Sequence, residues 1–168
     1  MSRNSKTMFF AFLIVSLIGN IQASQWTLSE GSDSLTIQQE QFIKKYIEII
    51  NSEDEEGFKS IIYPICLEKL EEQKVFFYTI LKSRFQNIIP GQISISVKRI
   101  GEDESLPFES TLVYPVRPTN IIMINYEKPD SSTAAKLIQV LKKDGEYFEV
   151  LPYPDQELLK KQPQLKSR

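Results

Sequence analysis

The stretch AAKLIQVLKKDGEYFEVLPYP, residues 134–154, predicts two antiparallel strands joined by a tight turn. Asp144 and Gly145 form the turn, because both residue types tolerate the positive φ angles of a type I′ hairpin. A two-residue turn also sets the register of the flanking strands. The predicted pairs are Lys143 with Glu146, Lys142 with Tyr147, Leu141 with Phe148, Val140 with Glu149, Gln139 with Val150 and Ile138 with Leu151.

Both faces of this hairpin are apolar, because successive side chains of a strand point to opposite sides. One face carries Leu137, Leu141, Phe148 and Val150, and the other carries Ile138, Val140, Tyr147 and Leu151. We therefore expect the hairpin to be central, with helices on one face and either a bent sheet or a partner subunit on the other. A homodimer through this second sheet face would cover the set that begins at Ile138.

Three helices are predicted before the sheet. The first spans residues 36–51 and begins at a capping box of Thr36 and Gln39. The second begins at a capping box of Ser52 and Glu55 and is stopped by Pro64. The third is predicted as one long helix over residues 67–89, because apolar residues recur there at helical spacing without a break.

Strands follow from residue 92 onward, where the apolar period changes from 3.6 to 2. They are predicted over residues 92–100, 109–116 and 120–127, before the hairpin. Helices that precede an antiparallel sheet indicate the α+β class.

The N-terminus has the pattern of a secretory signal. Basic residues precede an apolar run over residues 8–18, and small residues lead to Ala23. We predict cleavage after Ala23, which leaves 168 − 23 = 145 residues, and export to the periplasm or the extracellular medium. The predicted divisions are a signal peptide (1–23), a flexible lead-in (24–35), the α+β domain (36–155) and a C-terminal tail (156–168). The apolar run is shorter than the roughly 20 residues of a membrane span, so no stable span is expected after cleavage.

The composition excludes several classes of function. The chain has no His, which removes His-based nucleophile systems and His-ligated zinc. We expect no cofactor and no metal site. The mature chain would carry 20 − 2 = 18 basic and 22 acidic residues, a net charge of −4, and no basic stripe that would indicate nucleic-acid binding.

The order of elements resembles the nuclear transport factor 2-like superfamily, a cystatin-like α+β roll. The residues that carry the resemblance are NSEDEEGFKSIIYP (51–64), the long helix after it, and the hairpin around Asp144. The resemblance implies a cone-shaped roll in which three N-terminal helices pack on a strongly bent antiparallel sheet, with a pocket between them. Members include steroid isomerases, dehydratases, SnoaL-like polyketide cyclases and epoxide hydrolases, and also non-catalytic binding or dimerisation modules.

Most candidate pocket residues are polar residues on otherwise apolar faces. The polar candidates are Gln73, Arg84, Asn125, Tyr126, Gln139 and Glu149, and Phe77 of the long predicted helix is an apolar candidate. Glu149 lies opposite Val140, and a carboxyl group buried there would have a raised pKa and could serve as a general base.

Two further residues have alternative interpretations. Cys66 could be a nucleophile near a helix N-terminus, but a small buried side chain is favoured because no base or second Cys is available; pairing between two chains stays open. Arg117, between prolines, could hold an anion or be solvated.

The sequence therefore predicts an exported non-catalytic domain that binds a small apolar or amphipathic ligand or a protein partner. The alternative is an isomerase- or hydrolase-type enzyme that uses a carboxylate or a Tyr in the cone pocket. An exported structural protein with an apolar outer patch is a third interpretation.

Overall fold

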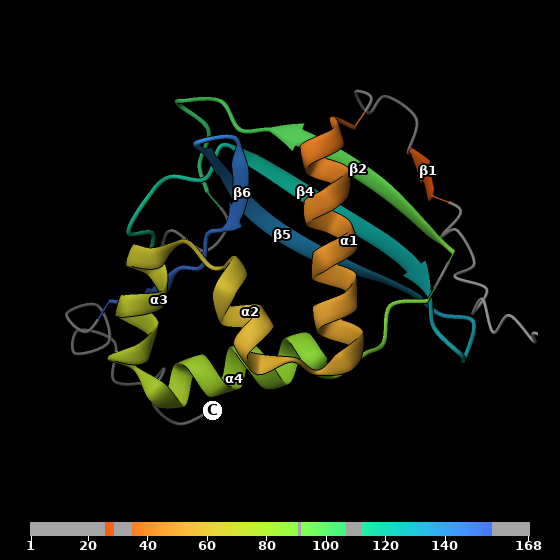
Figure 1. The fold of residues 1–168 in the computed structure, drawn as a ribbon, viewed down its shortest axis with the longest axis horizontal. Helices are drawn as coiled ribbons and strands as arrows, with labels where there is room; N and C mark the ends of the chain where they lie inside the picture. The colour runs from red at the N-terminus through yellow and green to blue at the C-terminus, as the bar shows by residue number, and fades with distance from the viewer. Residues whose placement is uncertain (1–25, 29–34, 91, 107–111, 156–168) are drawn as a thin grey trace, which may run out of the picture.

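The computed structural model describes residues 26–28, 35–90, 92–106 and 112–155, and the predicted signal peptide and tail lie outside them. The helices are α1 (Ile37–Ser52), α2 (Glu55–Ile61), α3 (Pro64–Glu71) and α4 (Lys74–Phe85). The strands are β1 (Trp26–Leu28), β2 (Ile93–Arg99), β3 (Leu112–Val113), β4 (Asn120–Glu127), β5 (Thr133–Lys143), β6 (Glu146–Glu149) and β7 (Tyr153–Pro154). The predicted α+β class is confirmed (Figure 1).

The main sheet has the strand order β1-β2-β4-β5-β6, and β3 pairs with β7 in a separate small sheet. The pairs β2–β4, β4–β5 and β5–β6 are antiparallel, whereas β1 runs parallel to β2. The hairpin of β5 and β6 therefore lies at one end of the sheet and not at its centre, which β4 occupies.

The predicted turn and register of this hairpin are confirmed. Asp144 and Gly145 have φ angles of 52° and 89°, the left-handed values that a type I′ turn requires. Four of the predicted pairs form the ladder, from Lys143 with Glu146 to Val140 with Glu149. One further hydrogen bond, from the Val150 N–H to the Gln139 carbonyl at 2.7 Å, continues beyond the end of β6.

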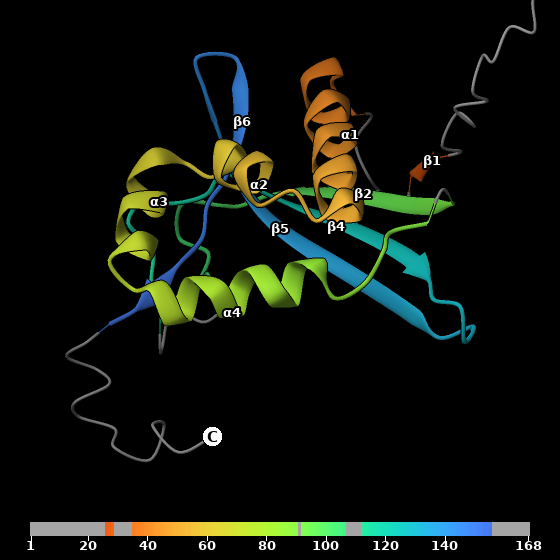
Figure 2. The same ribbon diagram turned by 60° about the horizontal axis from the view of Figure 1, so that its bottom comes forward.

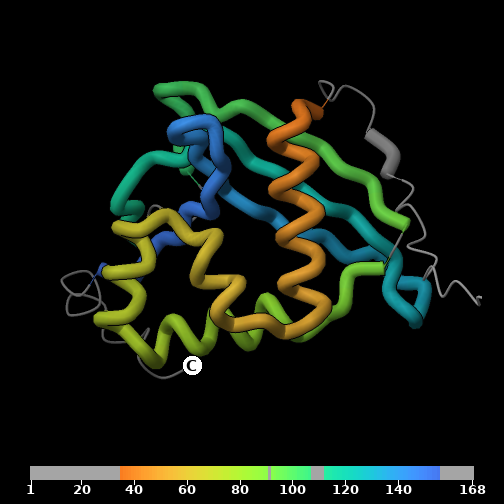
Figure 3. The backbone as a smooth tube through the Cα atoms, in the orientation of Figure 1, coloured from red at the N-terminus to blue at the C-terminus, as the bar shows by residue number. Residues whose placement is uncertain are grey.

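Helix α1 lies across one face of the sheet, and α2, α3 and α4 lie toward its β5 and β6 side, as Figures 1 and 3 show. The side chains on that face are almost fully buried: Ile93, Ile95, Ile122, Ile124, Ile138 and Val140. The expectation that a second chain is needed to cover this face is therefore wrong. Ile138, Val140 and Leu151 are buried under the helices of the same chain. Tyr147, the fourth residue of that set, packs against Phe42 of α1 with ring centroids 6.4 Å apart.

The predicted single helix over residues 67–89 is also wrong. Gln73 leaves the helical conformation, with φ −120° and ψ 57°, and separates α3 from α4. The break lets each helix bury its own short stripe, Cys66 and Leu70 on α3 and Phe77 and Leu81 on α4. No Gly or Pro marks this position in the sequence, and the apolar period continues across it.

The first predicted helix start is confirmed, and the second is displaced by two residues. Thr36 and Gln39 exchange both bonds of a capping box. Ser52 instead ends α1, because Glu53 adopts the left-handed conformation with φ 54°. Asp54 then caps α2 by accepting a hydrogen bond from the Gly57 N–H at 2.9 Å.

Two segments differ from their predicted structure. Residues 26–28 of the predicted lead-in form β1 beside β2. A strand was predicted over residues 109–116. In the described part of this segment, only Leu112 and Val113 form a strand, β3. Among the helices that the structure describes, none is long and apolar enough to cross a membrane.

Candidate functional site

A groove of about 660 Å³ runs between helix α4 and strand β5, and we call it the α4–β5 groove. Figure 2 shows α4 running at an angle to β5, with the C-terminal end of α4 nearest the strand. The apolar lining consists of Phe76, Ile80, Leu112, Tyr114, Tyr126, Ala134, Ala135, Leu137, Val150, Leu151 and Pro152. The polar lining consists of Thr79, Ser83, Arg84, Gln86, Asn87, Lys128, Lys136 and Gln139.

The groove follows the edge of the sheet. Lys136 and Leu137 point to opposite faces of β5, yet both line the groove, so the strand edge itself forms one wall. On the other wall, α4 contributes residues at the spacing of one helical face, from Phe76 to Arg84. Strand β6 pairs with β5 only from Val140 onward, which leaves the earlier part of the β5 edge open to α4.

Two of the lining residues, Arg84 and Lys136, belong to a set of buried and half-buried polar side chains that also includes Tyr46 and Glu149, and we call this set the polar cluster. The Nη2 atom of Arg84 donates to the Oε1 atom of Glu149 at 2.5 Å. The Nη1 atom of Arg84 donates to the carbonyl of Leu137 at 3.2 Å. The Arg84 side chain is 19% exposed and lines the groove, whereas the Glu149 side chain is 0% exposed and does not.

Lys136 joins the polar cluster to the end of α4. Its ammonium group donates to the carbonyls of Ser83 at 3.3 Å and Arg84 at 2.8 Å. These carbonyls belong to the last turn of α4, where the helix dipole favours a cation. The contact anchors the end of α4 to β5.

Two atoms of the polar cluster are buried without a hydrogen-bond partner in the described part of the chain: the Tyr46 hydroxyl oxygen and Glu149 Oε2. An unsatisfied buried polar atom is costly in a folded protein, and it marks a place for a water molecule or for function.

Burial shifts the ionisation of the polar cluster. Burial raises the pKa of Glu149, although the Arg84 and Lys136 charges oppose it. Burial also lowers the pKa of Lys136, and the neighbouring Arg84 charge adds to that shift. Desolvation raises the pKa of the Tyr46 hydroxyl above its usual range. The cluster therefore holds a carboxylate that takes up a proton more readily than a solvated one.

The structure brings four of the seven predicted site residues together. Arg84, Tyr126 and Gln139 line the groove. Glu149 does not line the groove but is bound to Arg84, which does.

The other three predicted residues lie elsewhere. Phe77 belongs to the hydrophobic core. Gln73 is at the start of α4, and its amide contacts the Pro154 carbonyl at 3.5 Å. Asn125 lies on the sheet face away from the helices, because its neighbours Ile124 and Tyr126 are the buried ones.

Tyr46 and Lys136 are not among the predicted site residues. Tyr46 stands in the apolar stripe of α1, where its ring indicates a core position and its hydroxyl gives no signal. Lys136 was detectable, because it precedes Ile138 and Val140 at a spacing of two and must share their buried face.

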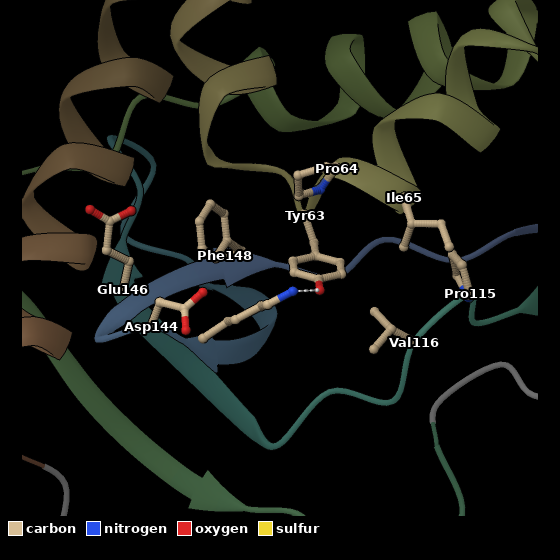
Figure 4. Close-up of a pocket in the computed structure, with 9 residues that line it drawn as sticks. Tyr63, Pro64, Ile65, Pro115, Val116, Asp144, Glu146 and Phe148 are labelled. Carbon is tan, nitrogen blue, oxygen red and sulfur yellow. Dashed lines mark hydrogen bonds between the residues drawn. The ribbon is translucent and has the colours of Figure 1, made fainter.

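A second pocket, of about 550 Å³, lies beside the hairpin turn (Figure 4). The rings of Tyr63 and Phe148 meet edge to face there, with centroids 5.8 Å apart. Lys143 donates to the Tyr63 hydroxyl at 3.1 Å and lies over its ring. The charged residues at this pocket are exposed, so it lacks the buried ionisable groups of the α4–β5 groove.

Cys66 and Arg117 make the contacts of residues that support the fold. Cys66 is fully buried within α3, and burial raises the pKa of its thiol to about 11, as expected of a core side chain rather than a nucleophile. Arg117 donates to the carbonyls of Gly101 and Glu104. Within the described ranges, no group of three His, Cys, Asp or Glu side chains could hold a metal ion.

A scan against protein-family models and searches of curated proteins and of solved structures find no match for this chain.

Proposed function

We propose that this protein is an exported, non-catalytic binding domain whose α4–β5 groove takes a small amphipathic ligand with an anionic group. The observation that carries the proposal is the chemistry of the groove lining. Most of its residues are apolar or aromatic, three carry a positive charge, and none of the described lining residues is Asp or Glu. The volume of about 660 Å³ lies within the range of small-molecule sites.

The three cations are Arg84, Lys128 and Lys136. Arg84 is the best placed of them to meet an anion. Its two described hydrogen bonds go to Leu137 and Glu149, which leaves three of the five N–H donors of a guanidinium for a ligand. An apolar tail would lie along Phe76 and Ile80 of α4.

Catalysis by Glu149 is the second candidate. The raised pKa of this carboxyl group and its unpartnered oxygen favour an isomerase- or hydrolase-type general base. Its complete burial opposes that role, because the Glu149 side chain does not line the groove. Under this alternative, Glu149→Gln would abolish turnover while the protein stays folded.

We also propose that the protein has a nuclear transport factor 2-like fold and is exported. The helices that precede an antiparallel sheet, and their position over one sheet face, support a nuclear transport factor 2-like roll. Export after cleavage at Ala23 would give a chain that begins at Ser24. Intact mass measurement of the protein from the exported fraction tests the cleavage: the expected mass corresponds to residues 24–168, and an intact N-terminus would contradict it.

Decane-1-sulfonate is a suitable probe for the groove, because it joins an apolar chain to a permanent anion. We expect saturable binding of one molecule per chain in isothermal titration calorimetry, and no binding of the decyltrimethylammonium cation. Native mass spectrometry of the protein from its own host would also reveal a retained small-molecule mass.

Matched variants locate the binding. Leu137→Glu places a negative charge in the groove at a residue that is 41% exposed, and we expect binding of the sulfonate to fall at least tenfold. Val75→Glu is the control, because Val75 is 84% exposed on α4 and does not line the groove. Equal binding by both variants would contradict the proposed site.

A further inference from the structure

We infer that binding of an anion in the α4–β5 groove is coupled to the uptake of one proton by Glu149. This inference rests on the proposed function, since it concerns regulation of the same site. It predicts a domain that holds its ligand more tightly in acid than at neutral pH.

The geometry makes Arg84 the link between ligand and proton. Its guanidinium contacts Glu149 at 2.5 Å on the buried side and lines the groove on the other. An anion that binds the groove side of Arg84 would share this guanidinium with the Glu149 carboxylate. Two anions on one guanidinium in a buried site repel each other, and protonation of one relieves the repulsion.

Glu149 is the anion that can accept the proton. Only its Oε1 atom accepts a hydrogen bond from Arg84, and its Oε2 atom is buried without a partner among the described residues. A proton on Oε2 would remove the buried negative charge and leave the contact of Oε1 with Arg84 intact. The Tyr46 hydroxyl, also without a partner, lies in the same polar cluster.

Four titratable side chains of the described residues interact with Glu149. The titratable groups that face it are Tyr46 of α1, Cys66 of α3, Arg84 of α4 and Lys136 of β5. The Tyr and Cys groups are neutral at neutral pH, because burial raises the pKa of both. Lys136 lines the groove and also interacts with Glu149. The experiment must therefore distinguish a proton taken up by Lys136 from one taken up by Glu149.

Binding takes up one anion and one proton. The free protein with ionised Glu149, one sulfonate anion and one proton from the buffer give the complex with neutral Glu149. The bond that forms is the O–H bond of Glu149, and the buffer acid loses the corresponding proton. The affinity should fall about tenfold per pH unit wherever Glu149 is ionised in the free protein and protonated in the complex.

Calorimetry of decane-1-sulfonate binding in two buffers with different ionisation enthalpies tests this on the unmodified protein. A sulfonate stays ionised throughout, so any proton taken up goes to the protein. We expect close to one proton per bound anion over the pH range where the affinity falls. Binding without proton uptake would overturn the coupling and leave the proposed function standing, whereas absence of binding would overturn the proposed function itself.

The Glu149→Gln variant tests whether Glu149 is the group that takes up the proton. We expect this variant to bind the anion with no proton uptake and with an affinity that no longer depends on pH, while Glu146→Gln on the exposed hairpin behaves as wild type. Uptake that persists in Glu149→Gln would assign the proton to Lys136 or another group and overturn the inference. If Glu149→Gln does not fold, infrared difference spectra of the wild type replace it: a protonated carboxyl band should appear on binding, and its absence would overturn the inference.

Discussion

Arg84 and Glu149 form an ion pair of 2.5 Å between α4 and β6, across 65 residues of sequence. Removing one partner of such a pair leaves an uncompensated buried charge, which typically costs about 3–5 kcal/mol. We therefore expect Arg84→Met to lower the free energy of unfolding by about that amount at neutral pH. The double variant Arg84→Met with Glu149→Gln should recover part of the loss, as urea denaturation would measure. A loss in the double variant equal to the sum of the losses in Arg84→Met and Glu149→Gln would show that the two side chains do not interact.

The raised pKa of Glu149 predicts a pH dependence of stability with a definite sign. Because the folded pKa lies above the unfolded value of about 4.3, the folded state binds more protons between the two values. The contribution is therefore complete below the unfolded pKa and is lost as the pH rises through the folded pKa. The difference in unfolding free energy between the wild type and Glu149→Gln should fall with pH across that window and be flat outside it.

Tyr46 offers a test of the unpartnered hydroxyl group. Tyr46→Phe removes a buried polar atom without a described partner and keeps the ring, so we expect stability to be unchanged or to rise by up to about 1 kcal/mol. The phenylalanine variant would be compared with the wild type in urea. A loss of more than about 1 kcal/mol would mean that a buried water joins the hydroxyl to its neighbours.

Gly145 is required by the backbone of the hairpin turn. Its φ of 89° is unfavourable for a residue with a Cβ atom, so Gly145→Ala should cost about 1 kcal/mol. Gly101→Ala is the matched control, because a Cβ atom there would meet nothing closer than 3.8 Å. Thermal or urea unfolding of the two variants should differ, and the same cost for both would exclude turn strain as the cause.

Cys66 should react slowly in the folded protein. The thiol is fully buried, and its pKa of about 11 keeps it protonated at neutral pH. We expect alkylation by iodoacetamide to be far slower in buffer than in denaturing urea. An exposed cysteine, introduced as Ser105→Cys together with Cys66→Ala, should react at similar rates in both solvents. Fast native reaction of Cys66 would instead indicate that α3 opens readily.

Local signals in the sequence predicted much of the fold. The Asp144 and Gly145 pair determined a turn type and register, and alternation of apolar residues predicted β4 with the bounds that the structure shows. The break at Gln73 was not predictable from periodicity, because it satisfies the packing of two helices against different partners. The place of the hairpin at the end of the sheet also depends on contacts between distant segments, which no local pattern contains.

The candidate site was only partly predictable for the same reason. Glu149 and Arg84 were found as polar residues on apolar faces, but their contact depends on how α4 crosses β5. The groove depends on the distance between a helix and a strand edge. The spacing of residues along the sequence does not determine this distance, so it could not predict the groove. Asn125 was misplaced because the sequence does not tell which face of β4 the helices cover.

The contact between Arg84 and the Leu137 carbonyl has a consequence for association of the folded chains. Along residues 133–139, β5 has β4 on one side and no strand on the other within the described residues. An open edge of this kind is a template on which a strand from another chain can add. Because Arg84 occupies one of the edge carbonyls and the C-terminal end of α4 lies nearest the strand, an incoming strand must first displace the helix. The docking of α4 therefore protects the protein against aggregation through this edge.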